Sequence, residues 1–165
     1  MTTAERARDL RQPGAAIVAA AHGLEHRDGV GAFNEPNFPT AHHRHVGRML
    51  WGRAGVGPAD VPVAQFYENF TGPVLMAMAE MGFCAPEELD AFVADGRILW
   101  GGGGLPINTA GGNLGEAYIH GFGNVVEAVR QIRGTSTCQV EGAELSLSVS
   151  GPNYAPGSAL LLGKV

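Results

Sequence analysis

Apolar residues along this chain fall into short blocks, several of which have the spacing of β-strands. A continuous apolar run at 15–21 predicts a strand buried on both faces, and residues 61–67 predict a second strand. A brief third strand is expected at 107–109. Residues 145–150 alternate leucine or valine with serine, which predicts a fourth strand with one wet face. Residues 159–162 are expected to form a last apolar strand.

Between these strands the apolar residues take helical spacing. One helix is expected to begin at the capping residue Thr40, after a long polar loop at 22–39, and to stop at Gly55. A methionine-rich helix begins at the cap Thr71 and is apolar around most of its circumference, which predicts burial between two layers. A short surface helix is expected at 87–94.

The last predicted helix carries two opposite stripes and stops at Gly134. The stripe expected to face the core contains Val125, Val126, Val129 and Ile132. The stripe expected to face water contains Glu127, Arg130 and Arg133.

The resulting order is β-α-β-α-β-α-β-β, which predicts an α/β fold with a mixed five-stranded sheet and helices on both faces. We expect one domain at 14–165, preceded by a helical segment at 1–13. Ligands of open α/β sheets bind beyond the carboxyl ends of the strands. Because Tyr67 and the loop after Thr109 both lie at carboxyl ends, we expect Tyr67 and Tyr118 to meet in one crevice.

The segment 105–124 is the strongest candidate for an active-site loop. Gly111 and Gly112 belong to a series of glycines that let the backbone approach a ligand closely. Tyr118 and His120 place two titratable side chains on the same segment. Flexibility alone would not require these side chains.

Composition and charge exclude several classes of protein. The chain has 165 residues, 45% of them hydrophobic, which suits one domain with a substantial core. A net charge of −5, with only 11 Lys and Arg, argues against nucleic acid as a partner. No apolar run reaches the roughly 18 residues of a membrane span, and the N-terminus lacks the apolar core of a signal peptide, so we expect a cytoplasmic protein.

The cysteines and histidines do not form a recognisable metal site. Cys84 and Cys138 fall in no metal or redox spacing, and we expect both to be reduced thiols. His42, His43 and His45 would point in different directions on a helix, and no carboxylate completes a ligand set.

Three segments together resemble the C-terminal half of the thiolase superfamily, and most closely its sterol carrier protein X-type, lipid-transfer-protein-like branch. They are Phe-Tyr-Glu-Asn-Phe-Thr at 66–71, Gly-Leu-Pro-Ile-Asn-Thr-Ala-Gly-Gly at 104–112, and the helix end at 127–134. Full thiolases contain two such halves, and the first carries the nucleophilic cysteine. The resemblance implies either a fragment or one subunit of a split enzyme, paired with an N-terminal half on another chain. It also implies a thiolase-type dimer and a zinc-ribbon/OB-fold partner protein.

This sequence departs from ordinary thiolases at the positions that matter for chemistry. Tyr67 and Tyr118 stand where thiolases carry two oxyanion-hole residues, and the segment 148–152 has no counterpart of the second thiolase cysteine. Paired tyrosines at these positions resemble the thiolase-like aldolases of steroid side-chain degradation. That resemblance implies retro-aldol cleavage of a β-hydroxyacyl-CoA, with coenzyme A as part of the substrate and no cofactor bound by this chain.

The retro-aldol reaction needs a base and an acid, and we expect one of Tyr67 and Tyr118 to serve as each, helped by His120. Two other functions remain open: a thiolase-like acyltransferase or condensing subunit, and a noncatalytic scaffold for an acyl-CoA enzyme. The residues expected to contact substrate are Asn69, Asn108, Gly111, Gly112, Glu116 and Asn124.

Overall fold

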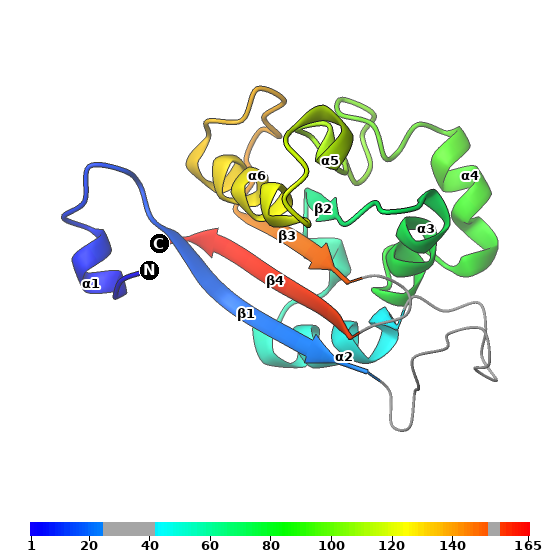
Figure 1. The fold of residues 1–165 in the computed structure, drawn as a ribbon, viewed down its shortest axis with the longest axis horizontal. Coiled ribbons are helices and arrows are strands. Elements are labelled where there is room, and N and C mark those ends of the chain that lie inside the picture. The colour runs from blue at the N-terminus through cyan, green and yellow to red at the C-terminus, as the bar shows by residue number, and fades with distance from the viewer. Residues whose placement is uncertain (25–41, 152–155) are drawn as a thin grey trace.

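The computed structural model describes residues 1–24, 42–151 and 156–165. Its centre is a mixed four-stranded sheet with the order β1-β4-β3-β2 (Figure 1). The central strand β3 is parallel to β2 and antiparallel to β4, and β4 is antiparallel to β1. The strands are β1 (Ala15–Gly23), β2 (Ala64–Phe66), β3 (Leu145–Ser150) and β4 (Gly157–Lys164).

The prediction of a fifth strand at 107–109 is wrong. Only Ile107 pairs with the sheet, through one parallel bridge to Ala64. The next residue, Asn108, has a φ of 49°, so the chain turns out of the extended conformation. The Asn108 side chain then takes the hydrogen bonds of Phe66 that another strand residue would have made.

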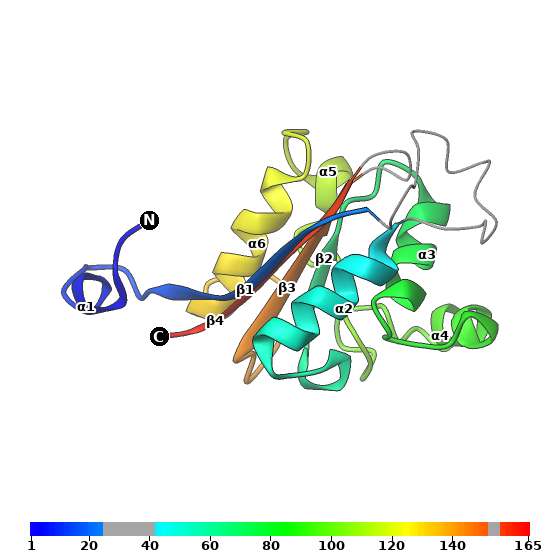
Figure 2. The same cartoon turned by 90° about the horizontal axis from the view of Figure 1, so that it is seen from below.

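Helices cover both faces of the sheet (Figure 2). On one face α2 (His43–Ala54) packs against β1 and β4, with α3 (Thr71–Glu80) beside it. On the other face α6 (Phe122–Arg133) crosses β2, β3 and β4. The shorter helices are α1 (Ala4–Ala7), η2 (Pro58–Asp60), η3 (Pro86–Glu88), α4 (Leu89–Ala94) and α5 (Gly112–Gly115).

The predicted helix ends are partly confirmed. Gly55 and Gly134 both cap their helices in the left-handed conformation, as the sequence predicts. Thr71 is the first residue of α3 and not its cap, which is Phe70. The expected cap Thr40 and most of the expected loop 22–39 lie outside the described residues.

Burial contradicts three of the patterns predicted for strands and helices. The strand β1 is not buried on both faces, because it is an edge strand whose Ile17 and Val18 are exposed. The methionine-rich helix α3 is not enclosed either, since only Val74, Ala77 and Met78 are buried. The serine face of β3 is not wet: Ser146 and Ser148 are buried, on the strand that α6 crosses.

The predicted stripes of α6 are only partly confirmed: Ile132 is buried and Arg133 is exposed as expected, but Glu127 and the valines differ. Glu127, expected in water, is only 2% exposed, whereas Val125, Val126 and Val129 are half-buried. The polar residues Asn124, Glu127 and Gln131 are spaced by three and four positions, so they share the buried side of the helix. A polar helix side therefore packs against a sheet.

The main core lies between the sheet and α2 and α3. Its most enclosed side chains each contribute about 1.5–3 kcal/mol by leaving water. These side chains include Leu50, Phe66, Met78, Met81, Leu147 and Leu161. In the described segments, no helix is both long enough and apolar enough to cross a membrane.

Candidate active site

The site is built where β2 ends. Tyr67 directly follows the strand, and its backbone N–H donates to the carbonyl of Val149 on β3 over 2.9 Å. The preceding residue, Phe66, is fixed by two amide side chains. Asn108 accepts from the Phe66 N–H over 2.7 Å and donates to its carbonyl over 3.0 Å, and Asn124 donates to the same carbonyl over 3.0 Å. Asn108 and Asn124 therefore hold the backbone that carries Tyr67.

Tyr67 and Tyr118 meet, as the topology of the sequence predicts. Their hydroxyl oxygens are 2.5 Å apart and share a hydrogen bond in which either oxygen can donate. The rings are inclined at 60° with centroids 6.3 Å apart, so contact is made at the hydroxyl ends. Tyr118 is 53% exposed, which leaves the pair open to a ligand from outside.

The Tyr67 ring packs against the backbone of Gly121. The residue has a φ of 81°, and a Cβ atom there would lie 2.9 Å from Cδ2 of Tyr67 and 3.2 Å from Oγ of Ser150. Any other residue would be strained at this φ and would also press on the ring. The close approach of backbone to ring thus requires glycine.

His120 lies beside the pair without joining its hydrogen bond. The His120 and Tyr118 rings meet edge to face, with centroids 5.3 Å apart and an interplanar angle of 78°. His120 is exposed and has a φ of 52°, an uncommon conformation that turns the chain back toward Tyr67. The imidazole is therefore placed to contact a ligand that reaches Tyr118.

The two predicted glycines differ in what surrounds them. Gly111 is exposed, whereas Gly112 is buried against the carboxylate of Glu68. Glu68 accepts a hydrogen bond from the backbone N–H of Asn113. Asn69, predicted to contact substrate, has a buried Oδ1 atom that accepts no hydrogen bond from the described residues.

Glu116 connects the middle of the glycine loop, which we define as residues 111–121, to α6. Its carboxylate accepts from Nη1 of Arg130 over 2.6 Å, and this hydrogen bond raises the pKa of Arg130 above its ordinary value. Arg130 also lies 3.7 Å from Glu127. The Glu116 carboxylate therefore attaches the glycine loop to α6.

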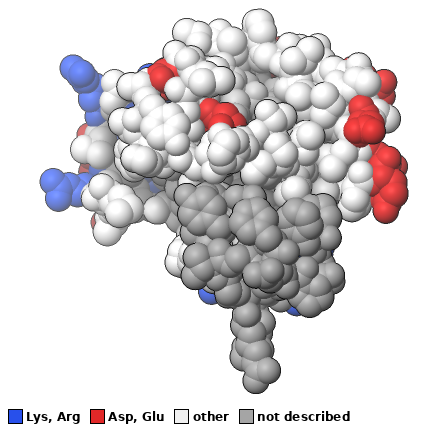
Figure 3. Space-filling view, turned by 45° about the vertical axis from the view of Figure 1, so that its right-hand side comes forward, with Lys and Arg blue, Asp and Glu red and all other residues white. Residues whose placement is uncertain are grey.

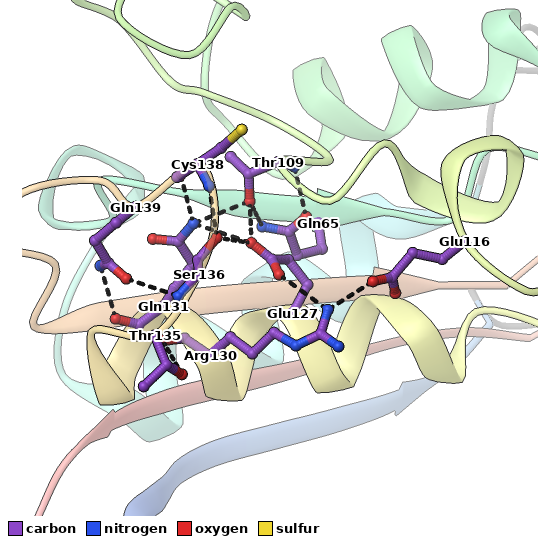
Figure 4. A network of polar contacts seen from close by, with 10 residues as sticks. All are labelled: Gln65, Thr109, Glu116, Glu127, Arg130, Gln131, Thr135, Ser136, Cys138 and Gln139. Atoms are coloured by element: carbon purple, nitrogen blue, oxygen red, sulfur yellow. Dashed lines mark hydrogen bonds and ion pairs between the residues drawn. The ribbon is translucent and has the colours of Figure 1, made fainter.

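A buried polar network, which the sequence did not predict, lies beneath the loop (Figure 4). Oε1 of Glu127 accepts from Thr109 and from Ser136, both over 2.6 Å, and from Gln131 over 3.1 Å. Gln65 of β2 makes two hydrogen bonds with Thr109: its Oε1 accepts from the Thr109 N–H, and its Nε2 donates to the Thr109 hydroxyl. The network connects β2, Thr109 just before the glycine loop, and α6.

The two cysteines lie away from the tyrosine pair in the chain. Cys84 follows α3, and burial, reinforced by Glu88, raises the pKa of its thiol. Cys138 lies in the loop after α6, and both thiols are free. In the part of the chain that the structure describes, no three His, Cys, Asp or Glu side chains gather in a way that could hold a metal ion.

A family comparison matches residues 23–162 to the thiolase C-terminal domain-like family. The chain belongs to this family. The resemblance drawn from the three sequence segments is thereby confirmed. Rat sterol carrier protein 2 is a more distant relative, 28% identical to this thiolase-like chain over 108 residues, which are 63% of the chain and 20% of that protein.

Two further relatives are named as a lyase and an aldolase. The 17-hydroxy-3-oxo-4-pregnene-20-carboxyl-CoA lyase of Mycobacterium tuberculosis is 45% identical over 99% of the thiolase-like chain. The steroid side-chain-cleaving aldolase of Thermomonospora curvata is 40% identical over the same share. The solved Ltp2-ChsH2(DUF35) aldolase covers 98% of the chain at 41% identity with a TM-score of 0.90. The thiolase-like chain spans 42% of the length of each of these three proteins.

Proposed function

We propose that this chain is the C-terminal half of a thiolase-like aldolase, which cleaves a carbon–carbon bond in a β-hydroxyacyl-CoA with a steroid or similarly bulky side chain. The observation that carries the proposal is the hydrogen bond between the Tyr67 and Tyr118 hydroxyls at the carboxyl end of β2. The steroid substrate class rests on the relatives at 40–45% identity.

The reaction divides naturally between two phenols. One tyrosine, acting as its phenolate, removes the proton of the substrate β-hydroxyl, the Cα–Cβ bond breaks, and the β-carbon becomes a carbonyl. The electron pair of the broken bond passes to the α-carbon as a thioester enolate. The other tyrosine then gives a proton to that carbon and releases the shortened acyl-CoA. Protons balance, because the enzyme gains one proton and gives one up.

The enolate also needs hydrogen-bond donors where its charge develops. We assign this task to His120, whose ring contacts Tyr118, and to Asn69, two residues after Tyr67. Asn108 and Asn124 position Tyr67, since both donate hydrogen bonds to the backbone carbonyl of the preceding residue, Phe66. Coenzyme A enters as part of the substrate, and the proposed reaction uses no cofactor held by this chain.

A second polypeptide completes this enzyme in our proposal. The relatives are more than twice as long as this chain, and the matched structure, the Ltp2-ChsH2(DUF35) aldolase, is named for two proteins. The large apolar side chains Leu114, Ile119 and Phe122 are exposed around Tyr118, and the valines of α6 are only half-buried. Figure 3 shows the side of the molecule at which β1, β2 and β3 end, and the described surface there is mainly uncharged. Such a surface suits an apolar partner or substrate.

We assign this surface to an N-terminal thiolase-like half on another chain. The assembly would include a thiolase-type dimer and a zinc-ribbon/OB-fold protein, as the family resemblance implies. We place the enzyme in the cytoplasm, where its two free cysteines stay reduced.

The proposal is tested by removing each hydroxyl in the assembled complex. Tyr67→Phe and Tyr118→Phe keep the rings, so the fold should survive, and circular dichroism checks this. Each variant should lower the rate of β-hydroxyacyl-CoA cleavage about 10²–10⁴-fold, the usual contribution of a general acid or base. Full activity in both variants would refute the proposal. Acyl transfer would instead need the cysteine nucleophile that thiolases carry in their first half, so a reactive cysteine in the N-terminal half that is acylated by an acyl-CoA substrate would favour that alternative.

A further inference from the structure

The glycine loop is attached at both ends to the two residues that follow β2. At its end, the ring of Tyr67 lies against Gly121. At its start, the carboxylate of Glu68 accepts from the backbone N–H of Asn113. Neighbouring residues of one segment thus hold residues 113 and 121, and Tyr118 lies between them.

The contact at the start of the loop is as tight as the contact at its end. Gly112 has a φ of 61° and is buried, and a Cβ atom there would collide with the Glu68 carboxylate. Glu68 therefore fills the space that a side chain at residue 112 would occupy. Its carboxylate sets how closely the loop approaches the end of β2.

Stability alone does not account for a carboxylate in this place. Oε2 of Glu68 is buried and accepts no hydrogen bond from the described residues. Asn113 is 8% exposed, and its side-chain Nδ2 likewise donates to none of them. Leaving buried polar atoms unpaired costs about 1–3 kcal/mol each, and sites that accept such a cost are commonly functional.

We propose that Glu68 is a positioning residue, whose carboxylate fixes the start of the glycine loop so that the Tyr118 hydroxyl meets the hydroxyl of Tyr67. This inference rests on the proposed two-tyrosine reaction. Glu68 acts through the backbone of Asn113 and takes no part in proton transfer. Its removal should therefore impair the chemical step more than substrate binding.

The first test compares Glu68→Ala with Glu68→Gln in the assembled complex. Glu68→Ala releases the loop and should lower kcat about 10- to 100-fold, the range expected when a catalytic group is displaced by up to 1 Å. KM should change by no more than about twofold, because substrate binding is not removed. Glu68→Gln keeps an acceptor oxygen for the Asn113 N–H and should recover most of kcat. Glu144→Gln is the control, since this glutamate is exposed and pairs only with Lys164 among the described residues.

The second test uses the contact with Gly112. Gly112→Ala adds a methyl group that collides with the Glu68 carboxylate and should also lower kcat. Combined with Glu68→Ala, the methyl group finds the space empty, so the double variant should lose much less than the product of the two single losses. Such non-additivity reports direct contact between two positions.

Hydrogen exchange gives a readout that needs no activity. Glu68→Ala should speed exchange of the amides at 112–118 in the purified complex, because the Asn113 N–H loses its acceptor, whereas Glu144→Gln should leave it unchanged. Unchanged kcat and unchanged exchange in Glu68→Ala would overturn the positioning role. So would a Glu68→Gln variant as impaired as Glu68→Ala. If Tyr67→Phe is inactive while Glu68→Ala is fully active, the inference fails and the proposed function stands.

Discussion

Replacing Gly121 by alanine isolates the contact that places Tyr67. The new Cβ would start 2.9 Å from the ring, whereas ordinary contact begins near 3.4 Å, so the ring must move by about half an ångström or more. Gly121→Ala combines this overpacking, about 1–3 kcal/mol, with the strain of a positive φ, about 1–2 kcal/mol. Since the two hydroxyls are 2.5 Å apart, the same displacement lengthens their hydrogen bond to about 3.0 Å, the long end of the normal range.

Gly134→Ala is the matched control. Gly134 caps α6 with a φ of 70°, close to that of Gly121, and a Cβ atom there would meet nothing within 4 Å. Both variants carry the φ strain, so their difference measures the contacts of the new methyl group with the Tyr67 ring and with Oγ of Ser150. For a protein of this size, 1 kcal/mol corresponds to about 2–4 °C in Tm. We therefore expect Gly121→Ala to melt about 2–12 °C below Gly134→Ala.

Activity should separate the two variants more strongly than melting does. Gly121→Ala should lose about tenfold or more in kcat, because a misplaced catalytic group slows the chemical step, and Gly134→Ala should keep nearly all of it. Thermal denaturation and steady-state cleavage of a β-hydroxyacyl-CoA by the complex provide both measurements. Equal Tm and equal kcat in the two variants would refute the claim that Gly121 is required by the Tyr67 ring.

Three further outcomes follow from the polar network, the exposed surface and the cysteine. Glu127→Ala leaves the hydroxyls of Thr109 and Ser136 without their acceptor and should destabilise the chain by about 2 kcal/mol or more in denaturant unfolding, whereas Glu144→Ala should stay within about 0.5 kcal/mol. Leu114→Asp should leave Tm unchanged, because the side chain is 94% exposed, but should reduce co-purification of the partner. Leu99→Asp is the control, since Leu99 is 60% exposed. Equal recovery of the partner with both variants would show that Leu114 is not part of the interface. Because burial raises the pKa of Cys84, alkylation of this thiol should be slower near neutral pH than that of free cysteine and should accelerate at higher pH; mass spectrometry of the alkylated peptide checks this, and a rate equal to that of free cysteine would contradict it.

The sequence predicts the tyrosine pair because strand ends and chain order decide it. Tyr67 follows a short buried strand, and Tyr118 follows a glycine-rich turn on the neighbouring segment, so the carboxyl-end rule for open sheets brings them together. That inference needs only the order of the elements. It does not depend on which side chains are buried.

Burial was predicted poorly wherever polar residues face the core. The serines of β3 and Glu127 of α6 are expected to face water, because hydrophobicity alone assigns polar residues outward. Asn124 and Gln131 share the side of Glu127 on α6. In the structure these polar residues are buried, and those of α6 bond to one another or to the backbone of Phe66. The spacing of three polar residues at 124, 127 and 131 was the available signal. Their burial could be recognised only once the positions of the hydrogen-bond partners Thr109 and Ser136 were known.

The hydrogen bonds around β2 also govern how the sheet can associate with other polypeptides. Along the outer side of β2, Ala64 bonds to the backbone of Pro106 and Asn108, and Asn108 occupies the polar groups of Phe66. That border is closed to any incoming strand. Within the described sheet the opposite border, β1, has no further strand beside it, and a bulge between Ile17 and Ala19 interrupts its regular ladder. Each border thus carries its own safeguard against templated aggregation.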